Sequence, residues 1–88
     1  MDLVNFMEEA TKRALEELLE DPTYKSHPMD DRMRMDILAY ALNRLPPKYV
    51  VTEKGHLYTR VNELKQQFRT DIIVELTKAI QFVQSHPR

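Results

Sequence analysis

The stretch Arg34–Val51 reads RMDILAYALNRLPPKYVV, and it decides the fold around it. Every residue of Ile37–Leu42 is apolar, a run that is too short to span a membrane and too uniform for a helix with one buried side. Pro46 has no backbone N–H to donate and disfavours helical backbone at Leu45, so the helix must end here. We therefore predict a helix over residues 31–45 that is covered on most sides, as a central helix or as half of a dimer interface.

The length and composition predict one small domain, residues 1–88. A chain of this size buries only about 60% of its unfolded surface, so a monomer is only marginally stable. This marginal stability favours a homodimer. A net charge of −1 argues against DNA, RNA or an anionic membrane as the partner. The chain has no cysteine and no basic, apolar leader, so we expect a cytoplasmic protein.

The first helix is predicted over residues 3–20, where apolar side chains recur every three or four positions and charged ones fall on the other side. Asp2 is the expected N-cap, and Pro22 marks the end. Residues 21–31 are predicted to form a loop, with Asp30 or Asp31 capping the next helix.

The region after the two prolines is predicted to form a β-hairpin over residues 49–59. Tyr49–Thr52 and His56–Thr59 are both rich in residues that favour strands, and Gly55 between them suits a turn with positive φ. A two-stranded hairpin is marginal alone, so it should pack on a helix or pair with its copy in a second subunit.

The last helix is predicted over residues 62–85, with Asn62 as its N-cap. Its apolar residues at helical spacing are Val61, Leu64, Phe68, Ile72, Leu76, Ala79, Ile80 and Val83. The predicted fold class is thus mainly α, with three principal helices and one short β-hairpin in a small domain that forms a homodimer.

The residues that most enzymes need are scarce. One glycine excludes glycine-rich phosphate loops, and the lack of cysteine excludes thiol catalysis and thiolate metal sites. His27, His56 and His86 are too scattered to share a metal on one helix face, so surface roles are preferred. We predict no catalysis, no structural metal and no cofactor.

The helix before the prolines carries a polar face that includes Arg32, Asp36, Tyr40 and Asn43. One interpretation is structural: Arg32 and Asp36 pair within the helix, and Asn43 satisfies backbone groups at the proline break. The other is that this face binds a ligand with charge and hydrogen-bonding edges, because arginine forks onto phosphate and aspartate accepts from purine N–H groups.

The helix and the two prolines that follow it resemble the ComFB family, which is named for a late competence protein of bacteria. The resemblance covers nearly the whole chain and is carried by RMDI over residues 34–37 and by ALNRLPPKYV over residues 41–50, preceded by Ala39. Gln67, Asp71 and Ile72 extend it more weakly. Many relatives carry cysteines before the Arg-x-Asp entry, where this chain has none, so no zinc role is carried over.

The resemblance implies a helical homodimer that acts as a receptor for cyclic dinucleotides, cyclic di-GMP above all, in the control of competence, motility or cell size. Arg34 lies on the opposite side of the helix from Asp36 and Asn43, so a site shared between subunits is the natural geometry. The candidate binding residues are Arg34, Asp36, Asn43, Arg44, Lys48 and Tyr49.

The alternative is a ligand-free protein–protein adaptor in competence regulation that uses the acidic first helix or the hairpin edge. In either case the downstream partner is an unidentified protein. The preference between guanine and adenine messengers, and the placement of the site within or between subunits, stay open at this stage.

Overall fold

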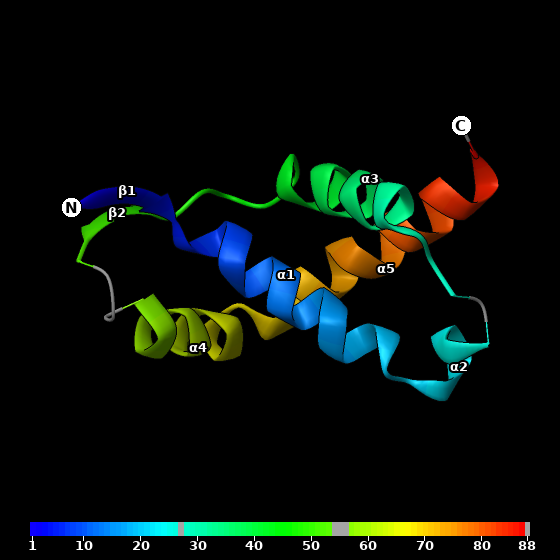
Figure 1. Ribbon diagram of the computed structural model, residues 1–88, viewed down its shortest axis with the longest axis horizontal. Coiled ribbons are helices and arrows are strands. Elements are labelled where there is room, and N and C mark those ends of the chain that lie inside the picture. The colour runs from blue at the N-terminus through cyan, green and yellow to red at the C-terminus, as the bar shows by residue number, and fades with distance from the viewer. Residues whose placement is uncertain (27, 54–56, 88) are drawn as a thin grey trace.

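A computed structural model describes residues 1–26, 28–53 and 57–87. The chain is mainly helical, as predicted, and forms an elongated body of 39 × 24 × 22 Å (Figure 1). Its elements are β1 (Asp2–Asn5), α1 (Phe6–Leu19), α2 (Pro22–Lys25), α3 (Asp31–Leu42), β2 (Tyr49–Thr52), α4 (Leu57–Gln67) and α5 (Arg69–Ser85).

The N-terminal segment is a strand followed by a helix, and not the single helix predicted over residues 3–20. Asp2 is therefore not the N-cap; Asn5 takes that position, and its side chain accepts a hydrogen bond from the N–H of Met7. From Phe6 onward the predicted amphipathic helix is present as α1. Before Phe6, antiparallel pairing with β2 satisfies the backbone, so a tertiary contact overrides local helix propensity.

A two-stranded antiparallel sheet is present and contains Tyr49–Thr52, as predicted, but its partner strand was wrong. β2 pairs with β1, with Leu3 opposite Val51 and Val4 opposite Val50. Leu57–Thr59, predicted as strand, instead begins α4. The predicted turn residue Gly55 and the first residue of that predicted strand, His56, lie outside the described residues. Val4 and Val50 both pack against the hydrophobic core, so pairing β2 with β1 buries apolar side chains from both strands.

The predicted loop of residues 21–31 contains the short helix α2, which begins at Pro22 and is capped by Asp21. The predicted N-cap Asp30 is confirmed at α3, where it accepts from the N–H of Met33 at 2.8 Å. α3 ends at Leu42, three residues earlier than predicted. The N–H groups of Asn43 and Arg44 both bond back to helix carbonyls, so the last turn tightens before the prolines.

The predicted helix over residues 62–85 is two helices, and Asn62 lies inside α4 rather than at an N-cap. The break falls at Phe68, where the backbone has φ −107° and ψ 20°. Hydrogen bonds continue across it, from Phe68 N–H to Leu64 and from Ile72 N–H to Phe68. The break allows α4 to pack on α1 while α5 packs mainly on α3.

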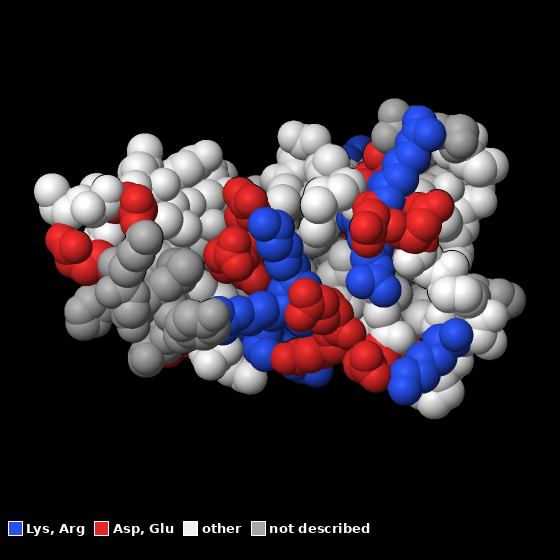
Figure 2. Space-filling view, in the orientation of Figure 1, with Lys and Arg blue, Asp and Glu red and all other residues white. Residues whose placement is uncertain are grey.

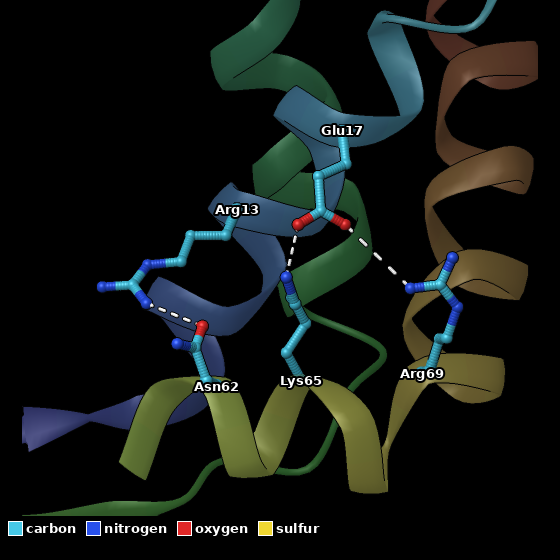
Figure 3. Close-up of polar contacts among 5 residues, drawn as sticks. All are labelled: Arg13, Glu17, Asn62, Lys65 and Arg69. Atoms are coloured by element: carbon cyan, nitrogen blue, oxygen red, sulfur yellow. Dashed lines mark hydrogen bonds and ion pairs between the residues drawn. The ribbon is translucent and has the colours of Figure 1, made fainter. Parts of the chain in front are cut away.

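Polar contacts on both sides of this break attach it to α1 (Figure 3). The carboxylate of Glu17 forms ion pairs with Lys65 on α4 and, at 4.0 Å, with Arg69 on α5. One turn earlier, Arg13 donates to the side-chain oxygen of Asn62 at 3.1 Å. The first helix thus holds the two halves of the predicted single helix in their relative orientation.

The hydrophobic core lies around α1, which contacts α2, α3, α4, α5 and β2 and runs between α3 and α4 in Figure 1. α3 was predicted to be covered on most sides, as a central helix or as half of a dimer interface, and within this chain it is not the central helix. Only Ile37, Leu38 and Ala41 of α3 are buried, while Met35 and Ala39 are exposed. α5 buries Ile72, Leu76, Ala79, Ile80 and Val83, all members of the predicted apolar stripe.

The side chain of Asn5 connects the start of α1 to the segment after the prolines. Its Oδ1 accepts from the N–H of Met7 at 3.1 Å and from the N–H of Lys48 at 2.8 Å. The N–H of Phe6 in turn donates to the carbonyl of Lys48 at 2.8 Å. One amide oxygen thus caps a helix and fixes the backbone at one candidate ligand residue, Lys48.

We expect Asn5→Ala to lower the free energy of unfolding by about 1–2 kcal/mol, because it removes a helix cap and leaves a second, part-buried N–H without its acceptor. Urea unfolding followed by circular dichroism measures the change. Asn62→Ala is the matched control, because its side chain makes one exposed contact across the surface. Equal stability of the two variants would contradict a special role for Asn5.

Candidate ligand-binding site

Three of the side chains on the polar face of α3 lie on successive turns, Asp36, Tyr40 and Arg44, with Arg44 just past the helix end. The guanidinium carbon of Arg44 lies over the ring of Tyr40, 3.5 Å from its centroid, and its Nη1 donates to the carbonyl of Tyr40 at 3.0 Å. Two contacts therefore hold a cation in place at the surface. A carboxylate, an aromatic ring and a guanidinium follow one another along this face.

α5 extends this row with two further rings. Phe82 lies with its ring centroid 5.0 Å from that of Tyr40, and His86 stacks on Phe82 at 4.3 Å. Nδ1 of His86 is also at hydrogen-bond distance, 2.9 Å, from the carbonyl of Phe82. We call the row Arg44, Tyr40, Phe82 and His86 the aromatic ladder.

The aromatic ladder borders a depression of about 370 Å³ between α3 and the C-terminal end of α5, which lie side by side (Figure 1). Its lining residues are Asp36, Tyr40, Phe82, Val83 and His86. Phe82 stays 46% exposed even though it is a large apolar ring. The depression thus combines flat apolar walls with one half-buried carboxylate, a composition typical of small-ligand sites.

The structure divides the six predicted ligand residues among separate places. Asp36 and Arg44 belong to the α3 face, and Asn43, the residue before Arg44, is exposed and is the C-cap of α3. Arg34 instead lines two depressions between α1 and α3, beside Glu16 and Leu19.

Lys48 and Tyr49 follow the prolines, beyond the end of α3. The Nζ of Lys48 lies 5.2 Å from the ring centroid of Phe68, and Tyr49 is exposed on β2. Within one chain, then, the structure brings together Asp36 and Arg44, and it places Arg34 on another side.

Phe82 and His86 were missed by the analysis of the sequence, which left Phe82 out of the apolar stripe and gave His86 a surface role. Their spacing of four residues on a helix was the available signal. What could not be read from the sequence is that Tyr40 of α3 lies next to them, because that depends on how α3 and α5 pack.

Acidic and basic side chains are interleaved on the face shown in Figure 2, where they do not gather into one basic area. Lys12 illustrates the pattern, because its Nζ lies 3.2 Å from Glu8 and 3.6 Å from Glu9. The contact with Glu8 is the main cause that raises the pKa of Lys12 above its ordinary value. The described part of this face therefore offers no continuous basic surface.

Neither a metal site nor a membrane span is found in the part of the chain that the structure describes. Its His, Asp and Glu side chains form no group of three that could hold a metal ion. Among the described helices, none has the length and apolar character needed to cross a bilayer.

The fold and the family comparison define a small helical domain of a known class. Residues 4–87 match the family model described as late competence development protein ComFB, so the chain belongs to the ComFB family. It is similar to the solved structure of the late competence protein ComFB from Bacillus subtilis, with 27% sequence identity and a TM-score of 0.75. That similarity covers 99% of this chain and 93% of the other. No curated protein sequence matches the chain significantly.

Proposed function

We propose that this ComFB-family protein is a non-enzymatic receptor for a cyclic dinucleotide, cyclic di-GMP above all, in bacterial second-messenger signalling that controls competence, motility or cell size. The observation that supports it most directly is the α3 face, where Asp36, Tyr40 and Arg44 present an acceptor, a ring and an ordered cation in sequence. A cyclic dinucleotide has the matching groups: purine N–H donors, flat bases and two phosphates.

A homodimer would match the symmetry of the proposed ligand. A cyclic dinucleotide with two identical bases has two-fold symmetry, and a two-fold dimer presents each of its surfaces twice. The separation of Arg34 from Asp36 within one chain is consistent with a site to which both subunits contribute. The downstream partner would then recognise the surface of the liganded dimer.

Calorimetric titration of the full chain with cyclic di-GMP tests this function. We expect saturable binding with one ligand per dimer if the site is shared, with the oligomeric state fixed by sedimentation in parallel. We also expect the ligand to be recovered intact by chromatography after long incubation. No heat of binding and no thermal stabilisation at millimolar cyclic di-GMP, or conversion of the ligand to a linear dinucleotide, would contradict the proposal.

A second candidate, the protein–protein adaptor, is favoured by the outer face of the two-stranded sheet. Leu3 and Val51 are opposite one another there, and both are exposed, as is Tyr49 two residues away. Large apolar side chains clustered on one face are typical of a contact surface. If this candidate is correct, Leu3→Lys weakens partner or subunit association while cyclic di-GMP gives no heat in the titration above.

A further inference from the structure

We propose that the depression bordered by the aromatic ladder is a guanine-binding subsite, in which Asp36 reads the base edge and Phe82 and His86 supply the stacking surface. This inference rests on the proposed function and deepens it, because it names the base and the residues that distinguish guanine from adenine. The size fits one base: about 370 Å³ is near the lower end of ligand pockets, which span roughly 300–1,000 Å³.

The aromatic ladder is ordered without a ligand. Each of its members is held by a neighbour: Arg44 by the ring and carbonyl of Tyr40, and His86 by the ring and carbonyl of Phe82. Tyr40 and Phe82 join the two halves across the α3–α5 contact. Because the rings are fixed by two packed helices, a base that stacks on them immobilises few side chains, which favours binding.

The exposure of Phe82 points to a flat apolar occupant. It is 46% exposed, while its neighbour Val83 is buried in the core. A purine that packs against the ladder removes this ring surface from water and gains stacking at the same time. Stacking alone does not select among bases, since every base has a flat face.

Selection comes from the carboxylate. Asp36 lines the same depression and lies one helical turn before Tyr40. An ionised carboxylate only accepts hydrogen bonds, with room for several at its two oxygens. Guanine offers two adjacent donors, N1–H and the N2 amino group, whereas adenine has an acceptor at N1, so the carboxylate favours guanine and disfavours adenine.

The cation at the other end of the ladder gives the base a direction. Arg44 and Phe82 both contact the Tyr40 ring, at 3.5 Å and 5.0 Å from its centroid, so a guanidinium lies near the depression and can meet the phosphate of a nucleotide whose base stacks there. A nucleotide is therefore the expected occupant, and a free base is a poorer one.

Three tests on the intact protein, each with its control, examine the subsite. Phe82→Ala should weaken cyclic di-GMP binding at least tenfold, whereas Gln81→Ala, at the exposed residue before it on the same helix, should leave it within twofold. Asp36→Asn should bring the affinities for cyclic di-GMP and cyclic di-AMP to within about threefold of one another, while Asp31→Asn on the same helix preserves the preference. NMR titration with GMP should shift the ring protons of Phe82 and His86, and ribose 5-phosphate should not.

The outcomes separate this inference from the function on which it rests. Wild-type binding of cyclic di-GMP with unchanged affinity in Phe82→Ala would overturn the subsite and leave the receptor function standing. GMP shifts at Phe82 and His86 without any cyclic dinucleotide binding would support the subsite and overturn the receptor function. Equal affinity of the wild type for cyclic di-GMP and cyclic di-AMP would overturn the role of Asp36.

Discussion

Leu76→Ala should lower the free energy of unfolding by about 2–5 kcal/mol, which is the range for truncating a fully buried leucine. Leu76 has no exposed surface and lies in the middle of α5, in the stripe that buries Ile72 and Ile80 one turn on either side. The truncation leaves a cavity where α5 packs against its neighbours. Because the whole domain is only marginally stable, a loss of this size removes a large part of its stability.

Denaturant unfolding of the two variants Leu76→Ala and Val74→Ala measures this effect. Val74 is on the same helix but is exposed, so its truncation should change the free energy of unfolding by about 0.5 kcal/mol or less. A comparable loss in both variants would show that the two faces of α5 are equally packed, for example because a second subunit covers Val74. A small loss for Leu76→Ala alone would contradict the packing of the core.

Arg34→Ala, Asp36→Ala, Asn43→Ala and Arg44→Ala are each expected to weaken cyclic di-GMP binding by about ten- to a hundredfold, or roughly 1.5–3 kcal/mol, if each side chain makes a direct polar contact. Thermal stability should change little in Arg34→Ala, Asn43→Ala and Arg44→Ala, because these three side chains are exposed. Calorimetry and thermal melting on the same samples separate the two effects. Lys78→Ala is the control, because it removes an exposed cation on α5 that forms an ion pair with Glu75 on the same helix.

The structure also makes the four variants unequal. Arg44→Ala and Asp36→Ala alter the aromatic ladder and its depression, whereas Arg34→Ala alters the surface between α1 and α3. If the binding site lies wholly within one chain at this depression, Arg34→Ala keeps the wild-type affinity; if it is shared between subunits, Arg34→Ala loses affinity too. Variants that all unfold, or that all bind as the wild type does, would contradict this assignment of the site.

Local sequence signals were sufficient for the parts of the fold that depend on neighbours in the chain. Asp30 was predicted as a possible N-cap of α3 and is the cap, because capping needs only a side-chain acceptor three residues before a free N–H. The apolar stripe of α5 was predicted from its periodicity and is buried. The double proline ends the helical region, since the restriction it imposes on the backbone is local.

The same signals failed where the choice depends on distant partners. Residues 3–5 fit a helical pattern, yet they form β1 because the strand after the prolines offers its backbone groups. Leu57–Thr59 has strand-forming residues, yet it begins α4 once β2 has paired with β1. The break at Phe68 also depends on distant partners. The apolar stripe is continuous in the sequence, but α4 packs on α1 whereas α5 packs mainly on α3, so the helix axis changes direction between them.

For the candidate site, the sequence by itself determined the polar face of α3 and its resemblance to the ComFB family, because both depend on residue spacing along one helix and one motif. It placed Asp36, Tyr40 and Arg44 within a few turns of one another. Only the tertiary structure added Phe82 and His86, which are about forty residues later in the chain and reach Tyr40 because α5 packs along α3. Periodicity reveals which side chains share a face of one helix, whereas the packing of two helices decides which faces meet.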